Sequence, residues 1–183
     1  MKTEYGKSSD QRQEECPAIY VADLADYNAG MLRGRWIEID EHTEVEDIWQ
    51  AIREMLAEKG HEEWAVHDYN NLPSSELGEW PCLEQVIEVA RAVRERGYAL
   101  VAGYLAWAGL DELSDLDDRF LGIYESVEDY AYEFVNDCYD LEKALGNLAV
   151  YFDYAAFARD LDLNGDINAV ELSYEEVAIF RSY

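Results

Sequence analysis

Apolar residues recur at helical spacing along much of the chain, and carboxylates fill many of the positions between them. In the segment 127–138, for example, Val127, Tyr130, Phe134 and Cys138 form an apolar side, and acids occupy the intervening positions. A helix with this pattern buries one side and leaves its acids facing solvent or a partner. The fold must therefore keep several acidic helix faces on its outside.

The charge of the chain is strongly one-sided, with 41 Asp and Glu against 14 Lys and Arg and a formal net charge of -27 over 183 residues. High net charge often prevents folding, but 5 Trp, 14 Tyr and 5 Phe supply enough apolar area for a core. Excess negative charge destabilises a compact chain by self-repulsion, so it points to a basic partner such as a nucleic-acid-binding groove. Direct binding of nucleic acid or anionic lipid is disfavoured.

No apolar stretch approaches the roughly 18 residues that a membrane span requires. The N-terminal residues 1–15 are polar and lack the apolar core of a signal peptide. The cysteines at Cys16, Cys82 and Cys138 are odd in number and match no metal-ligand spacing. Reduced thiols in a cytoplasmic protein are therefore expected.

The first 70 residues predict a small ββαβ unit. Short apolar runs at 18–24 and 34–40 predict two strands joined by a Tyr-Asn-Ala-Gly turn, and 63–69 predicts a third strand. Between them, Thr43 and Glu46 form a capping-box pattern at the start of an amphipathic helix. The spacing of its apolar residues predicts that one side of this helix faces the core.

Helices dominate the middle of the chain. Apolar spacing predicts helices over 82–96, 98–108, 127–138 and 148–161, and the end of the chain, 176–183, predicts a strand. This order of elements is typical of an α+β fold with helices in the middle.

The predicted domain organisation follows from these elements. A flexible tail covers 1–17, an N-terminal α+β module covers 18–72, a central helical module covers 73–110, and a C-terminal α+β module covers 111–183. These boundaries fall in loop-like stretches rich in Pro, Gly, Ser and Asp.

The acids concentrate in two windows. Residues 111–142 hold 12 acids and one base, and residues 38–63 hold 10 acids and two bases, so several helix faces carry almost no compensating charge. Duplex DNA carries one negative charge per roughly 1.7 Å, so two copies of the chain could match the charge of about 90 Å of duplex. The candidate partner-binding carboxylates are Glu41, Glu44, Asp47, Glu54, Glu58, Asp111, Glu112, Asp115, Asp117, Asp118, Glu125, Glu128, Asp129, Glu133, Asp137 and Asp140.

Three segments carry a family resemblance. They are AIYVADLADYNAGMLRGRWIEI at 18–39, WAVHDYNNLP at 64–73 and YFDYAAFARDL at 151–161. In order and spacing they resemble the ArdA family of antirestriction proteins, and the likeness covers about residues 18–183. The resemblance implies an elongated, curved homodimer that mimics bent B-form DNA and occupies the DNA groove of type I restriction-modification enzymes, chiefly their methyltransferase core. It also implies a protein that mobile genetic elements use to escape restriction.

The resemblance implies neither catalysis nor a cofactor or metal, so the chain is not expected to be an enzyme. It further implies that dimer contacts come from the C-terminal half of the chain. The residues expected at the dimer interface are Val127, Tyr130, Ala131, Phe134, Val135 and Cys138.

An acidic calcium-binding or protein-interaction module is the alternative. Residues 160–171, DLDLNGDINAVE, match the spacing of an EF-hand loop after a helix. The calcium ligands would be Asp160, Asp162, Asn164, Asp166 and Glu171. No second loop follows to pair with this one, and chance matches are frequent in an Asp-rich chain.

Two further interpretations remain open. Adaptation to high salt would also produce an acidic surface, whatever the function. His42, His61 and His67 lack partners at ligand spacing, and His67 next to Asp68 suggests a hydrogen-bonded structural pair.

Overall fold

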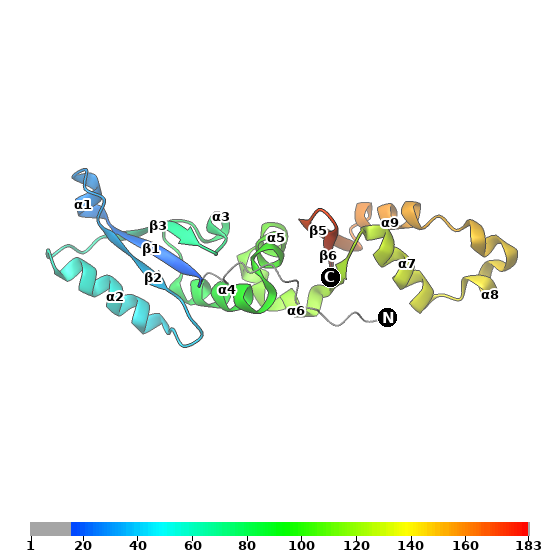
Figure 1. The fold of residues 1–183 in the computed structure, drawn as a ribbon, viewed down its shortest axis with the longest axis horizontal. Coiled ribbons are helices and arrows are strands. Elements are labelled where there is room, and N and C mark those ends of the chain that lie inside the picture. Colours follow the sequence, from blue (N-terminus) through cyan, green and yellow to red (C-terminus); the bar gives the residue numbers. More distant parts are fainter. Residues whose placement is uncertain (1–15, 183) are drawn as a thin grey trace. The chain divides into compact units, whose positions relative to one another are not determined.

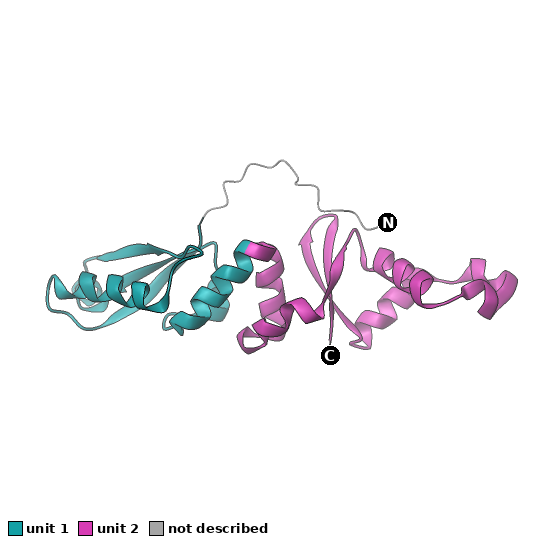
Figure 2. Ribbon diagram, turned by 90° about the horizontal axis from the view of Figure 1, so that it is seen from below, with its two compact units in different colours: residues 1–94 teal, residues 95–183 magenta. Residues whose placement is uncertain are grey.

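The protein is an α+β chain, described by a computed structural model over residues 16–182 (Figure 1). It divides into two compact units at Arg94 and Glu95 (Figure 2), and each unit is described by itself below. Residues 1–15, most of the predicted tail, lie outside the described residues, as does Tyr183. No helix in the described range combines the length and apolarity that a membrane crossing requires.

The first unit contains an antiparallel sheet in the order β2-β1-β3. Its strands are β1 (Ala18–Asp23), β2 (Gly34–Glu38) and β3 (Trp64–Asn70), which confirms the three predicted strands to within two residues at each end. Helix α2 (Val45–Ala57) packs against β1 and β2.

Helix α2 begins later than the capping-box pattern predicts. Its N-cap is Glu44, and the backbone amide of Glu44 donates to the carboxylate of Asp47 at 2.9 Å. Thr43 instead accepts a hydrogen bond from the amide of Asp40 and donates to the Asp40 side chain. The prediction was wrong by one residue because Asp40 competes for the Thr43 hydroxyl.

The link between β1 and β2 also differs from the predicted simple turn. It contains a short helix, α1 (Leu24–Asn28), which Asp23 caps by accepting the amides of Ala25 and Asp26. Asp is among the preferred N-cap residues, so Asp23 favours a short helix before the chain turns at residues 27–30.

Three helices follow the first sheet: α3 (Ser74–Leu77), α4 (Leu83–Arg96) and α5 (Tyr98–Ala108). The latter two confirm the predicted helices. Gly97 separates them with a φ of +87°, a conformation that residues with a Cβ rarely adopt. Within α5, the side chains of Leu100, Val101, Tyr104 and Leu105 are buried.

The second unit contains an antiparallel sheet in the order β4-β6-β5. Its strands are β4 (Phe120–Tyr124), β5 (Ile167–Ser173) and β6 (Glu176–Arg181), and only β6 was predicted. The acidic segment before β4 forms a 3-10 helix, η1 (Leu110–Asp115), and a single helical turn, α6 (Leu116–Arg119).

Helices α7 (Val127–Cys138) and α9 (Tyr154–Leu163) pack against each other beside this sheet. Ser126 caps α7 by accepting the amide of Asp129. The helix predicted over 148–161 starts instead at Tyr154, where Asp153 accepts the Ala156 amide. The chain before it forms α8 (Leu141–Leu145) and a second 3-10 helix, η2 (Gly146–Tyr151).

Candidate functional site

The acidic residues on α2 and just before it all lie on the surface of the first unit. Glu41, Glu44, Asp47, Glu54 and Glu58 are exposed. Two of them lie close to a base, because Glu58 shares Arg33 with the buried Asp23 and Asp26, and Glu54 lies 3.9 Å from Arg35. This face therefore carries less net charge than the sequence suggests.

Ion pairs also reduce the charge of η1 and α6. Arg119 lies 3.2 Å from Asp115 and also pairs with Glu112, while Arg96 lies 2.7 Å from Asp117. Asp111 and Asp118, the other two predicted carboxylates of this segment, are exposed. A surface pair of this kind stabilises the fold by about 1 kcal/mol or less. The two arginines nevertheless reduce the local negative charge that a basic partner would meet.

Helix α7 presents the least compensated acidic face. Glu125, Glu128, Asp129, Glu133, Asp137 and Asp140 are all exposed, and within residues 16–182 none of them forms an ion pair. Asp129, Glu133 and Asp137 follow each other at four-residue spacing, so they form one row about 6 Å apart along the helix. Like charges at this spacing destabilise a helix. Asp129 lies in the first turn of α7 and accepts the Ser126 hydroxyl, but helix stability does not explain Glu133 and Asp137 in the same row.

The residues predicted at a dimer interface divide into two groups. Tyr130, Ala131 and Val135 are buried inside the chain's own second unit. Val127 and Phe134 are half-buried, and Cys138 is exposed. Only this second group can meet another molecule directly in this conformation.

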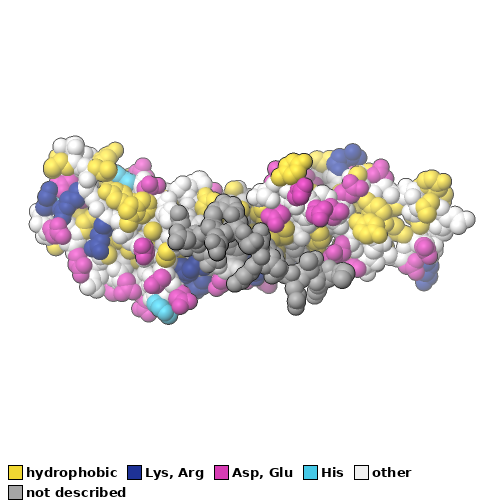
Figure 3. All heavy atoms as spheres, in the orientation of Figure 1, with side chains coloured by type: hydrophobic (Ala, Val, Ile, Leu, Met, Phe, Trp, Pro, Cys, Tyr) yellow, Lys and Arg dark blue, Asp and Glu magenta, His cyan; other side chains and the backbone are white. Residues whose placement is uncertain are grey.

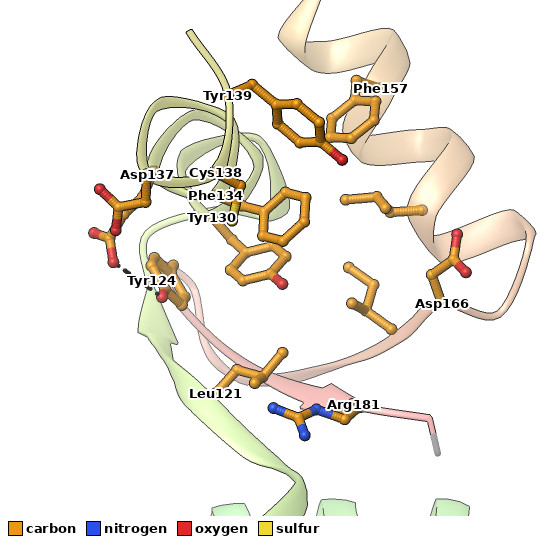
Figure 4. A pocket seen from close by; sticks show the side chains of 13 residues that line it. Leu121, Tyr124, Tyr130, Phe134, Asp137, Cys138, Tyr139, Phe157, Asp166 and Arg181 are labelled. Carbon is orange, nitrogen blue, oxygen red and sulfur yellow. Dashed lines mark hydrogen bonds between the residues drawn. The ribbon is translucent and has the colours of Figure 1, made fainter.

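A pocket of about 690 Å³ opens beside these residues in the second unit (Figure 4). Elements α7, α9, β4, β5 and β6 surround it, and aromatic and aliphatic side chains form most of its wall. Its lining includes Leu121, Tyr124, Tyr130, Phe134, Cys138, Tyr139, Phe157, Leu161 and Ile167. Charged residues lie at its edges, with Glu133 and Asp137 on α7 and Asp166 and Arg181 on the opposite side.

Tyr124 connects this pocket to the acidic face. Its hydroxyl donates to Glu133 across 3.4 Å. Burial, followed by the negative charge of Glu133, raises the pKa of Tyr124 to about 12. The phenol therefore stays protonated at neutral pH and remains a hydrogen-bond donor to the α7 carboxylate.

The segment α8–η2 exposes apolar residues that sequence analysis did not single out. Leu148, Val150 and Tyr151 are 65%, 81% and 79% exposed. The run LAVY at 148–151 falls in the helix predicted over 148–161, but in the structure it forms part of η2, and these three side chains are at the surface. Several exposed apolar residues in one segment indicate an interaction site. Figure 3 shows hydrophobic and acidic side chains side by side on the second unit.

A buried charge cluster lies in the first unit, where sequence analysis left His61 without a partner. Nδ1 of His61 lies 2.7 Å from Asp23, and Nζ of Lys59 lies 2.9 Å from Asp26. Arg33 lies within 3.6 Å of both aspartates. In the described residues, Asp23, Asp26 and His61 are the group whose atoms lie close enough together to hold a metal. Because Lys59 and Arg33 already balance the two carboxylates, the cluster is explained as structural.

The predicted His67–Asp68 pair is not formed. The ring of His67 instead packs edge-on against Tyr27, with the ring centroids 4.6 Å apart, and Asp68 accepts the amide of Tyr69. The register between β1 and β3 shifts at this point, since Tyr20 pairs with Asp68 and Val21 pairs with Val66, and His67 is left between the two pairs.

The calcium loop of the alternative interpretation does not take the EF-hand conformation. Asp160 and Asp162 lie in helix α9, Asn164 and Asp166 lie in the turn after it, and Glu171 lies in strand β5. Among the described residues, no metal-type group forms from these side chains. Pairing of β5 with β6 extends the second half of the would-be loop into a strand.

The model of one protein family, described as antirestriction protein (ArdA), matches residues 19–176 of the chain. The match takes in β1 through the first residue of β6, and thus both units. No curated protein matches the chain.

Proposed function

The chain belongs to the ArdA family of antirestriction proteins, and on that premise we propose that it mimics DNA and occupies the DNA-binding groove of type I restriction-modification enzymes. Its proposed target is the methyltransferase core of these enzymes. The observation that carries this proposal is the acidic surface of α7 and its flanking residues, where six exposed carboxylates lack any ion-pair partner within the described residues. Inhibition would then require occupancy of the groove and no chemistry by this protein.

Counterion release supplies the physical basis of this mimicry. A groove that binds DNA gains affinity because phosphates replace the ions around its Lys and Arg side chains. Carboxylates held on a helix would gain affinity in the same way, because they too would replace the ions around these side chains. Because α7 fixes their positions beforehand, less conformational entropy is lost on binding than for a flexible acidic tail.

We further propose that the protein acts as a homodimer through its second unit. The apolar pocket beside Phe134 and the exposed residues Val150 and Tyr151 are complementary in chemistry. In a two-fold dimer, the α8–η2 segment of each copy would fill the pocket of the other, because such interfaces are self-complementary. Burial of these side chains would remove the exposed apolar surface from water.

The proposed setting is the cytoplasm of a cell that a mobile genetic element has entered, where restriction enzymes meet incoming DNA. The cytoplasmic location follows from the proposed target, and the link to a mobile genetic element follows from the family.

A set of charge-neutralised variants tests the mimicry. The first variant carries Glu128→Gln, Glu133→Gln and Asp137→Asn, all on α7. The matched control carries Glu171→Gln, Glu175→Gln and Glu176→Gln, three exposed acids of the β5–β6 hairpin. Both variants change the net charge equally.

We expect the α7 variant to inhibit a purified type I enzyme about tenfold more weakly, and the control variant to inhibit nearly as well as the unmodified protein. Equal losses in the two variants would show that total charge alone decides inhibition, and would contradict a dedicated α7 face.

A further inference from the structure

One row of side chains crosses the first sheet on the face opposite α2. Trp36 of β2 pairs with Tyr20 of β1, and Tyr20 pairs with Asp68 of β3. Residues directly opposite each other in antiparallel strands project to the same face. Arg35, the neighbour of Trp36, contacts α2, so Trp36 and its row lie on the other side of the sheet.

The two rings of this row form an exposed aromatic surface. Their centroids lie 5.4 Å apart at an interplanar angle of 58°, and Trp36 is 47% exposed. A buried core position would explain an indole ring at low exposure, but not one with half its surface in water. Figure 3 shows hydrophobic side chains at the surface of this unit.

Gly34 holds the tyrosine of this surface in place. A Cβ at Gly34 would lie 2.7 Å from Cζ of Tyr20 and would also clash with the carbonyl oxygen of Val21. The Tyr20 ring therefore lies directly over the glycine backbone on β2. Because Gly34 has no side chain, the Tyr20 ring can pack closely against the backbone of β2 next to Trp36.

Two carboxylates flank the rings on the same face. Glu38 lies two residues after Trp36 on β2, and Asp68 lies opposite Tyr20. Both are exposed, and neither takes part in an ion pair within residues 16–182. Asp68 uses Oδ1 to accept the amide of Tyr69, which leaves its second oxygen for another donor.

We propose that this surface, made of Tyr20, Trp36, Glu38 and Asp68, binds an arginine side chain of the partner enzyme. A guanidinium group stacks on aromatic faces and pairs with carboxylates in a forked geometry, and lysine matches this combination less well. The inference rests on the proposed function, because a groove that binds DNA presents arginine to phosphates. It adds a specific contact that charge mimicry alone does not contain.

A peptide titration tests this surface without the enzyme. The full-length protein is titrated with tri-arginine and separately with tri-lysine, and the indole N–H signals of its tryptophans are followed by NMR. We expect a saturable shift of the Trp36 signal that is at least threefold stronger for tri-arginine. Trp80, which is 68% exposed in the loop before α4, is the matched reference. Equal shifts at Trp36 and Trp80, or no preference for arginine, would overturn the proposal.

Two tryptophan variants test the same surface against the enzyme. Trp36→Leu is expected to weaken binding to a type I methyltransferase about fivefold without changing its salt dependence, since no charge is removed. Trp80→Leu is expected to leave binding unchanged. If the unmodified protein does not bind the enzyme, the proposed function fails while the peptide result still stands. If it binds and Trp36→Leu binds equally well, the arginine contact fails.

Discussion

Nδ1 of His61 lies 2.7 Å from Oδ2 of Asp23, a fully buried carboxylate that also caps helix α1. The two residues lie 38 positions apart in sequence, and their contact joins the end of β1 to the segment before β3. Lys59 and Arg33 balance the charge of Asp23 and Asp26, two carboxylates that would otherwise be costly to bury.

Asp23 is expected to make the protein sensitive to acid. Burial raises the pKa of Asp23, but hydrogen bonds from His61 and from the amides of Asp26 and Ala25 outweigh it, so the pKa is lowered. A carboxyl whose folded pKa lies below its unfolded value stabilises the fold above about pH 4, and this stabilisation is lost as pH falls through the folded pKa.

Urea unfolding at several pH values between 7 and 3 checks this prediction. Asp23→Asn should lower the free energy of unfolding at pH 7 by about 3 kcal/mol and should flatten its decline toward acid. Asp118→Asn, a change at an exposed carboxylate, is the control and should follow the unmodified protein. A decline in Asp23→Asn as steep as in the unmodified protein would assign the acid sensitivity to other groups.

Gly103 is expected to tolerate no side chain. A Cβ at this position on α5 would clash with Cγ1 of Val170 on β5. Gly103→Ala should therefore destabilise the protein by about 1–3 kcal/mol through overpacking. Adding Val170→Ala should recover part of this loss in thermal unfolding, because it removes the clashing methyl group. If the second change brings no recovery, the two residues are not in contact.

The Tyr124–Glu133 contact predicts an alkaline transition. With a folded pKa of about 12 against an ordinary value near 10, Tyr124 stabilises the fold below pH 10 and loses this effect as pH rises through 12. Absorbance titration of the protein against Tyr124→Phe isolates this one phenol. Glu133→Gln should lower its pKa, because a repelling charge is removed. An unchanged pKa would mean that burial alone sets it.

Removal of the exposed apolar residues of η2 is expected to weaken the proposed dimer. Val150→Ser with Tyr151→Ser should shift the protein toward monomer by at least tenfold in dissociation constant, measured by sedimentation equilibrium. Leu163→Ser with Tyr174→Ser, two other strongly exposed apolar residues, should leave the dimer intact. A monomeric unmodified protein would refute the dimer itself.

The long amphipathic helices could be predicted because each buries a periodic apolar side. In α2 and α4, residues such as Ile48, Ile52, Val86 and Val93 are buried where the spacing places them. The ends of helices were harder to predict, because a nearby residue can occupy the side chain of an expected N-cap. Asp40 does this to Thr43.

Strands β4 and β5 could not be predicted in the same way. Strand β4 pairs with β6, more than 50 residues later, and the second half of an apparent calcium loop forms β5. Such pairing depends on distant partners and leaves little local signal. The acidic residues were visible in the sequence, but Arg119 and Arg96 could be paired with particular carboxylates only in three dimensions.

Competition with DNA tests the central claim most directly. A labelled duplex containing the recognition sequence is bound to a purified type I methyltransferase, and its apparent dissociation constant is measured at increasing concentrations of the protein. The account predicts that this constant rises in proportion to the protein concentration, without a plateau, and that the inhibition weakens as salt increases. A plateau with a complex that holds enzyme, DNA and this protein together would contradict it.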